Sequence, residues 1–214
     1  MGKDGILITS DSKIKERALL LGHYNKRCKI EIDKNSEYYK YYMTGKGMKL
    51  RAHPIAIRIA NEQFKKLNSM NSKKQEFANL MIEKLSDIRG IEVLRPNNDS
   101  INSWYSILFK YNESEMGGIT RERFVEALHA EGAVEIDIPN STCPLHTLEL
   151  FNSTHNLYSN YNNIKHNENE FTNANIFFNS IIKLPVYYEE YERDIVIKYI
   201  RAIKKVSNNI KELM

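Results

Sequence analysis

Apolar residues recur at every third or fourth position along much of the chain, which is the spacing of a helix that buries one face. The first such stretch follows Asp11, a favourable N-cap residue, and ends at Gly22. The next begins at Pro54, where the missing N–H of proline costs no hydrogen bond, and ends at Gly90. The pattern therefore predicts a capped helix and a long helix, the latter kinked near the Asn-Ser-Met-Asn-Ser sequence at 68–72.

Three further helices are expected in the second half of the chain. The first runs from Thr120, an N-cap residue, to Gly132, which ends it. The second covers 174–184, and Leu-Pro-Val-Tyr then interrupts the helical pattern. The last covers 189–213 and has the apolar stripe of an amphipathic helix.

Short apolar or alternating segments at 5–10, 91–96, 103–111 and 133–138 predict strands. Three of these strands fall after the long helix and are interspersed with helices. That order predicts an α+β domain, with a small, mostly antiparallel sheet packed against helices. The stretch 22–53 has no regular period, and a loop of that length within a compact domain is often functional.

Composition fits a globular protein, because 42% of the 214 residues are hydrophobic and 27% are charged. The net charge of +4 is small and dispersed, so we expect no nucleic-acid partner. Cys28 and Cys143 are the only cysteines, which excludes a disulfide scaffold and a zinc ribbon. No apolar run is long enough for a signal peptide or a membrane span, so we expect a cytoplasmic protein with no membrane partner.

The sequence Thr-Gly-Lys-Gly-Met-Lys-Leu-Arg-Ala-His-Pro at 44–54 has the features of a phosphate site. Gly45 and Gly47 allow backbone amides to approach an anion, and Lys49 and Arg51 add cationic donors. The spacing matches neither a Walker A motif nor a dinucleotide-binding turn. A solvated basic loop is the alternative interpretation.

Three histidines are candidates for a substrate pocket. His23 and His53 flank the irregular stretch, and His146 ends a Cys-Pro-Leu-His sequence at 143–146. A lone histidine is more often a surface or structural residue than a functional one, so that alternative stays open. The Cys and His spacings match no common zinc pattern, and we predict no metal site.

Four separate stretches, in order, resemble the C-terminal half of the DegT/DnrJ/StrS sugar aminotransferases, which depend on pyridoxal 5'-phosphate. Residues 2–24 resemble that family's Gly-Glu-Gly-Gly turn, the strand after it and the next helix. Residues 47–68 resemble its phosphate-loop arginine segment and the long helix that follows. Residues 117–151 resemble its helix, strand and Pro-Leu-His loop, and residues 174–187 resemble its closing Leu-Pro segment.

The resemblance implies a fold-type-I transferase made of two parts. Residues 1–53 would be a remnant of the large cofactor domain, and residues 54–214 the C-terminal small domain with a long bridging helix. In the family, the loop at 44–54 reaches across a dimer to the cofactor phosphate of the partner subunit. Lys49 and Arg51 take the positions of the phosphate-binding residues, although many members have Asn where this chain has Lys49.

The family's Schiff-base lysine would fall before Met1, so we expect no catalytic residue within this sequence and a truncated or split enzyme. The implied reaction moves an amino group from an amino acid to a keto-sugar, commonly nucleotide-linked, or to a related cyclic ketone. The expected partners are a second copy of the chain or a complementary N-terminal fragment. Two alternatives stay open: a non-catalytic dimerising module, and a relative that uses the cofactor to dehydrate a sugar.

Overall fold

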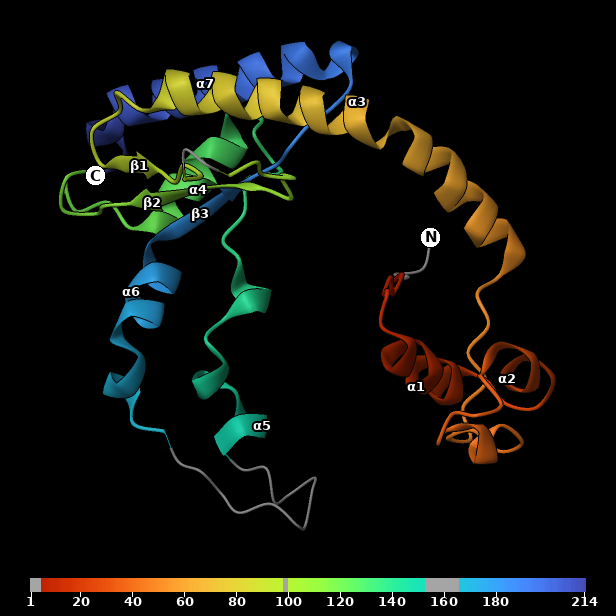
Figure 1. Cartoon of the computed structure of the whole chain (residues 1–214). Helices are drawn as coiled ribbons and strands as arrows, with labels where there is room; N and C mark the ends of the chain where they lie inside the picture. The colour runs from red at the N-terminus through yellow and green to blue at the C-terminus, as the bar shows by residue number, and fades with distance from the viewer. Residues whose placement is uncertain (1–4, 98–99, 153–165) are drawn as a thin grey trace. The chain divides into compact units, whose positions relative to one another are not determined.

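The computed structural model describes residues 5–97, 100–152 and 166–214 (Figure 1). It divides the chain into two compact units, Met1–Leu67 and Asn68–Met214. The boundary lies within the long helix α3, Pro54–Leu85, rather than at its first residue. The assignment of 1–53 to a cofactor domain and of 54–214 to a small domain therefore stays a prediction.

The first unit is built around helices α1, Ser12–Gly22, and α2, Lys26–Glu31. Asp11 caps α1 as predicted, because its carboxylate accepts hydrogen bonds from the N–H groups of Lys13 and Ile14. The short helix α2 and a 3-10 turn at Tyr39–Tyr41 lie within the stretch predicted to be irregular. The core of this unit is small and consists of Leu19, Leu20, Cys28 and Ile32.

The predicted strand at 5–10 is wrong for this structure. Residues 5–9 have no regular structure, and the side chains of Ile6 and Ile8 are 85% and 89% exposed. A strand needs a neighbour for its backbone N–H and C=O groups, and no described residue pairs with this segment. The segment is apolar and contains β-branched residues, but it has no partner strand among the described residues.

Helix α3 begins at Pro54 as predicted and ends at Leu85, five residues before Gly90. It continues through 68–72 without a helical break. All of its fully buried side chains belong to the second unit: Phe77, Ala78, Met81, Ile82 and Leu85.

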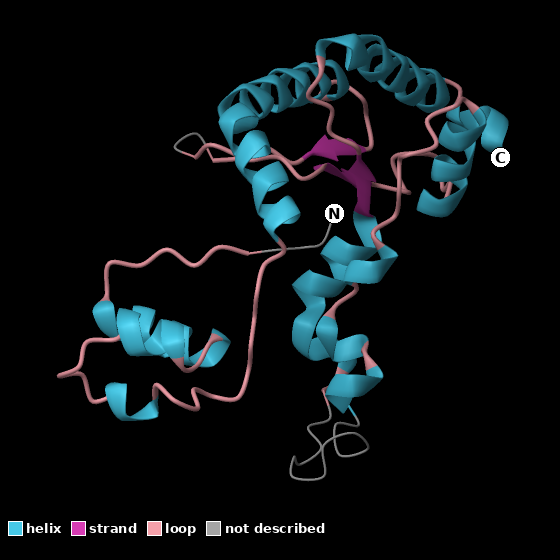
Figure 2. Cartoon of the chain, turned by 90° about the vertical axis from the view of Figure 1, so that its right-hand side faces the viewer, coloured by secondary structure: helices cyan, strands magenta, loops and turns pink. Residues whose placement is uncertain are grey.

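The second unit contains a three-stranded antiparallel sheet in the order β1-β2-β3. Its strands are Ile91–Val93, Ile107–Tyr111 and Ile181–Leu184. Phe109, at the centre of β2, pairs with Val93 on one side and Ile182 on the other, and it is fully buried. The predicted fold class, a small antiparallel sheet packed with helices, is confirmed (Figure 2).

The third strand is not where the sequence pattern placed it. Residues 133–138 form no strand and contribute only an isolated bridge between Asp137 and Lys183. The strand is instead 181–184, which was predicted as the end of a helix. The helix α6, Thr172–Ser180, stops before the β-branched Ile181 and Ile182, whose side chains are buried on the sheet.

Two amphipathic helices complete the core of the second unit. Helix α4, Arg121–Ala130, is capped by Thr120 as predicted. Helix α7, Arg193–Asn208, lies beside the second half of α3 (Figure 1) and buries Val196, Tyr199, Ile200, Ala202, Ile203 and Val206. The remaining helical segments are short: α5 at Glu149–Asn152 and 3-10 turns at Asn140–Thr142, Leu145–Thr147, Glu168–Phe171, Glu190–Glu192 and Ile210–Leu213.

Candidate functional site

The first unit has an open, basic hollow of about 720 Å³. Two segments line it: the turn into α2 and the segment just before α3. Together they contribute His23, Tyr24, Asn25, Lys26, Arg27, Lys49, Leu50, Arg51 and Ala52. Four of these side chains are cationic and none is acidic, so the hollow has the charge of an anion-binding site.

Backbone hydrogen bonds hold the two segments together. The N–H of Leu50 donates to the carbonyl of Gly22 at 2.8 Å, and the N–H of Lys46 donates to the carbonyl of Leu20 at 2.8 Å. On the other side, the N–H of Asn25 donates to the carbonyl of Tyr42 at 2.7 Å. Backbone contacts therefore attach the basic segment to the end of α1.

Gly45 allows this close approach. Its φ of +52° is in the left-handed region, and a Cβ placed there would lie 2.3 Å from the carbonyl oxygen of His23. The carbonyl oxygen of Leu20 would be only 2.7 Å away. Gly47 also has a positive φ, of +80°, but a Cβ there would meet nothing within 4 Å. Both glycines were expected to let backbone amides approach an anion. Neighbouring backbone atoms leave no room for a side chain at Gly45, whereas there is room for one at Gly47.

Lys49 and Arg51, the two predicted phosphate ligands, are both exposed and both line the hollow. The ammonium of Lys49 lies 5.3 Å from the centre of the Tyr24 ring, which is a cation–π contact. Neither side chain forms an ion pair with any residue that the structure describes. Their charges are therefore available to a ligand.

The three candidate histidines have different surroundings within their own units. His23 lines the hollow, and its Nε2 lies 2.9 Å from the Nη1 of Arg27. His53 is outside the lining, and its Nδ1 accepts the N–H of Ile55 at 3.3 Å at the start of α3. His146 belongs to the second unit, where its ring stacks on Phe171 with centroids 4.7 Å apart.

The sequence model of the DegT/DnrJ/EryC1/StrS aminotransferase family matches residues 1–201. The chain belongs to this family. A curated relative, the spore coat polysaccharide biosynthesis protein SpsC of Bacillus subtilis (strain 168), is 24% identical over 208 residues, which are 95% of this chain and 50% of SpsC. The chain therefore spans half the length of this curated relative.

Solved structures with the same fold are also enzymes of about twice this length. The E. coli GDP-4-keto-6-deoxy-D-mannose-3-dehydratase with bound hydrated PLP aligns with a TM-score of 0.68 at 18% identity, over 92% of this chain and 49% of that one. S. venezuelae DesV aligns with a TM-score of 0.67 at 16% identity, over 94% of this chain and 46% of DesV. At these identities the likeness establishes the fold and does not choose between amino transfer and dehydration.

The hollow of this DegT-family chain fits the phosphate of pyridoxal phosphate in charge and is large enough to admit it. A phosphate dianion prefers guanidinium and ammonium donors, and Arg51 and Lys49 supply one of each. Residues 2–4, which belong to the predicted Gly-Glu-Gly-Gly-like turn, lie outside the described residues.

Sequence reasoning missed Lys26 and Arg27 as lining residues of the hollow. The guanidinium of Arg27 donates to the Glu31 carboxylate at 2.6 Å, whereas the Lys26 ammonium has no ion-pair partner among the described residues. The available signal was the run of basic residues that follows His23 within the irregular stretch. The turn at Asn25, with φ of +59°, places both neighbours of Asn25 in the lining.

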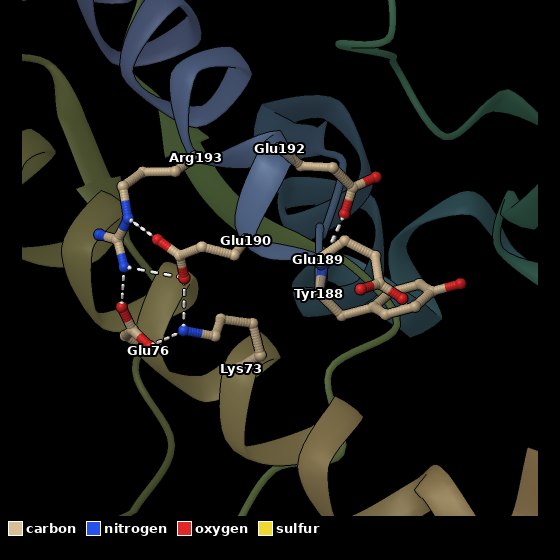
Figure 3. A network of polar contacts seen from close by, with 7 residues as sticks. All are labelled: Lys73, Glu76, Tyr188, Glu189, Glu190, Glu192 and Arg193. Atoms are coloured by element: carbon tan, nitrogen blue, oxygen red, sulfur yellow. Dashed lines mark hydrogen bonds and ion pairs between the residues drawn. The ribbon is translucent and has the colours of Figure 1, made fainter.

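The second unit has its own charged cluster, shown in Figure 3. Glu190 accepts from Arg193 at 2.5 Å and from Lys73 at 2.7 Å, and Glu76 contacts the same two cations. Arg193 and, secondarily, Lys73 lower the pKa of Glu190 to about 2. Because the cluster joins α3 to the start of α7 and satisfies its own charges, it stabilises the fold and offers no free donor to a substrate.

No group of three metal-ligating side chains is found among 5–97, 100–152 and 166–214. Over the same residues, no helix combines the length and the apolar character needed to cross a membrane.

Proposed function

We propose that this chain is part of a pyridoxal-phosphate-dependent sugar aminotransferase and that its hollow holds the phosphate of the cofactor. The observation that carries the proposal is the joint lining of the hollow by Lys49 and Arg51 on a segment attached to α1 by backbone hydrogen bonds. Family membership supports the cofactor and the type of reaction. The substrate is a keto-sugar or a related cyclic ketone, and the amino donor is an amino acid.

Pyridoxal phosphate supplies the electron sink for amino transfer when it is bound. The role of this chain is to anchor and orient it. Arg51 can bind two phosphate oxygens through its planar guanidinium, whereas Lys49 contributes a single point charge. The contact of Lys49 with the Tyr24 ring places its ammonium beside another residue of the lining. Of the two candidate histidines in the first unit, His23 lines the same site and His53 does not.

The active form is proposed to be a homodimer, or a complex with a complementary N-terminal fragment. Large apolar side chains of the first unit support an assembly, because Phe64 is 73% exposed and Ile55 is 65% exposed on α3. Ile6 and Ile8 are exposed in the unpaired segment 5–9. A core of four residues buries little apolar surface for a unit of this size, so further surface has to be covered.

The cofactor proposal is tested by measuring the affinity of the full chain for pyridoxal phosphate. A well-formed charged hydrogen bond contributes about 1.5–3 kcal/mol, so Arg51→Ala is expected to weaken binding by about ten- to a hundredfold. Lys49→Ala is expected to have a smaller effect, because a flexible point charge is a looser ligand. Lys46→Ala is the matched control: Lys46 is exposed on the same segment and does not line the hollow. Equal affinities for the Arg51→Ala and Lys46→Ala variants would refute the proposed role.

Amino transfer is distinguished from sugar dehydration by the product. Isotope-labelled amino nitrogen from the donor is expected to appear in the sugar product of the assembled enzyme. A deoxygenated sugar without the label would instead assign the chain to the dehydratase alternative, and absence of both products in a cofactor-loaded assembly would favour the non-catalytic module.

A further inference from the structure

Glu16 has a buried carboxylate to which the proposed cofactor site gives no role. It lies on α1, and only 6% of its surface is exposed. Within the described ranges it forms no ion pair with a lysine, arginine or histidine. Burying a carboxylate is costly unless hydrogen bonds replace the water that it loses. The groups that donate to Glu16 therefore indicate what this residue does.

The two oxygens of the Glu16 carboxylate bind two points of one turn, residues 33–36. Its Oε1 accepts the N–H of Asp33 at 3.1 Å, and its Oε2 accepts the hydroxyl of Ser36. The turn is closed by a further bond, from the Ser36 N–H to the Asp33 carbonyl at 3.0 Å. Hydrogen bonds to an ionised carboxylate are roughly twice as strong as those between neutral groups. Glu16 therefore holds the turn 33–36 against α1.

Ser36 connects this turn to the tyrosine-rich 3-10 turn that follows it. While the Ser36 hydroxyl donates to Glu16, its oxygen accepts the N–H of Tyr38 at 3.2 Å. The Ser36 carbonyl accepts the N–H of Tyr39 at 3.1 Å, and the Tyr39 carbonyl accepts the N–H of Tyr42 at 2.9 Å. Hydrogen bonds therefore run without a break from the Glu16 carboxylate to the end of the 3-10 turn.

Two neighbouring carbonyls at the end of this 3-10 turn hold both segments that line the hollow. The Tyr42 carbonyl accepts the N–H of Asn25 at 2.7 Å, and Asn25 is part of the lining. The Tyr41 carbonyl accepts the N–H of Gly45 at 2.9 Å, and Gly45 lies in the segment that carries the two proposed phosphate ligands. A displacement of these carbonyls would therefore shift both sides of the hollow.

We infer that Glu16 is a positioning residue of the cofactor site, because its carboxylate and Ser36 hold the carbonyls that align the two lining segments. The inference rests on the proposed function, since it takes the hollow as the site of the cofactor phosphate. Glu16 does not line the hollow, and its negative charge repels a phosphate. Loss of that charge would strengthen phosphate binding if charge were its only influence. Loss of the positioning role would weaken it.

The test measures the affinity of the full chain for pyridoxal phosphate by isothermal titration calorimetry. Glu16→Gln keeps the shape of the side chain and removes its charge. Glu37→Gln is the matched control, because Glu37 is an exposed carboxylate next to Ser36 with no hydrogen bond or ion pair to the described part of the chain. Ser36→Ala removes the connecting hydroxyl, and Ser36→Thr retains it. Circular dichroism checks that each variant retains its helices.

We expect Glu16→Gln and Ser36→Ala each to weaken cofactor binding by about threefold or more, and Glu37→Gln to leave it unchanged or strengthen it slightly. Ser36→Thr should bind the cofactor as the wild-type chain does. At saturating cofactor, the phosphorus-31 resonance of the bound phosphate should differ between Glu16→Gln and wild type. A loss of stability alone would leave that resonance unchanged, because the chains that bind would hold the phosphate in the same way.

Hydrogen exchange by mass spectrometry on the cofactor-free chain gives a second readout. The amides of Asn25 and Gly45 donate to the two carbonyls at the end of the 3-10 turn. In Glu16→Gln both amides should lose about threefold or more of their protection, and those of α7 in the second unit should keep theirs.

Equal cofactor affinities of Glu16→Gln and Glu37→Gln, or unchanged protection of the Asn25 and Gly45 amides in Glu16→Gln, would overturn the inference. The proposed function survives either result if Arg51→Ala still weakens cofactor binding. A loss of amide protection in Glu16→Gln, together with cofactor binding that ignores Arg51→Ala, would refute the proposed function. The role of Glu16 at a cofactor site would then be refuted with it, although Glu16 would still order the lining segments.

Discussion

Gly45→Ala is the substitution that separates the position of the basic segment from its chemistry. The residue lies in the segment that carries Lys49 and Arg51, but it has no side chain and does not line the hollow. Its φ is +52°, and a Cβ would lie 2.3 Å from the His23 carbonyl oxygen and 2.7 Å from that of Leu20. Both obstacles are backbone atoms, so neither can rotate away as a flexible side chain would.

The expected cost has two parts. A left-handed conformation costs a residue with a Cβ roughly 1–2 kcal/mol. Moving the Leu20 carbonyl also breaks the hydrogen bond that it accepts from Lys46, which contributes about 0.5–1.5 kcal/mol, and the His23 carbonyl has to shift as well. The sum is about 1.5–3.5 kcal/mol against the attachment of the basic segment to α1.

Gly47→Ala is the matched control, because Gly47 also has a positive φ, of +80°, but open space around its Cβ position. Gly47→Ala should cost only what the left-handed conformation costs a residue with a Cβ, about 1–2 kcal/mol. Hydrogen exchange by mass spectrometry on the full chain reports the protection of the amides of Lys46 and Leu50, which donate across this contact. Gly45→Ala should reduce that protection by roughly tenfold or more and weaken binding of pyridoxal phosphate.

Equal losses of amide protection at Lys46 and Leu50 in Gly45→Ala and Gly47→Ala would contradict the proposed packing role of Gly45. That result would mean that the carbonyl groups of Leu20 and His23 can move without destabilising the contact. The position of the basic segment would then depend on something other than its attachment to α1.

Three further predictions concern the second unit. The pKa of Glu190 is lowered from 4.5 to about 2, so the stability that its pairs with Arg193 and Lys73 provide is complete above about pH 4.5 and is lost as the pH falls towards 2. Urea midpoints should therefore fall less steeply over that window for Glu190→Gln than for wild type, and parallel profiles would contradict the assignment. Tyr111→Phe should lower the free energy of unfolding in urea by about 1–3 kcal/mol, because the Tyr111 hydroxyl donates to the Ile119 carbonyl at 2.9 Å within the core. An unchanged urea midpoint would show that water replaces this hydrogen bond. Phe124→Ala, at a fully buried position, should cost about 3–5 kcal/mol in thermal unfolding, and a loss below about 1 kcal/mol would mean that the core collapses around the gap.

Elements with both a cap and a sustained helical period were predictable from sequence. Asp11 and Thr120 mark helix starts, and the structure confirms both, because those caps depend on residues within one turn. The segment 5–10 and the third strand were not predictable in the same way. A strand depends on a partner that is distant in sequence. An apolar, β-branched segment therefore predicted a strand at 5–10 that has no neighbour among the described residues, and Ile181–Leu184 was missed because its Ile-Ile-Lys-Leu sequence also fits the end of a helix.

In the candidate site, too, the residues that lie close together in the sequence were easier to predict than those that only the fold brings together. Lys49 and Arg51 were identified because glycines and basic residues lie together in one short segment. Lys26 was missed because its proximity to that segment depends on the turn at Asn25 and on hydrogen bonds between segments. His53 does not line the hollow, and its ring nitrogen accepts the N–H of Ile55, so its place in a substrate pocket stays a prediction.

The central claim is that the hollow of the first unit binds the phosphate of pyridoxal phosphate through Lys49 and Arg51. Phosphorus-31 NMR of pyridoxal phosphate titrated with the full chain tests it most directly, because the signal comes from the phosphate itself. The account predicts a shifted or broadened resonance with wild type and with Lys46→Ala, and a signal close to that of free cofactor with Arg51→Ala at the same concentrations. An identical phosphorus signal with the wild-type and Arg51→Ala chains would contradict it.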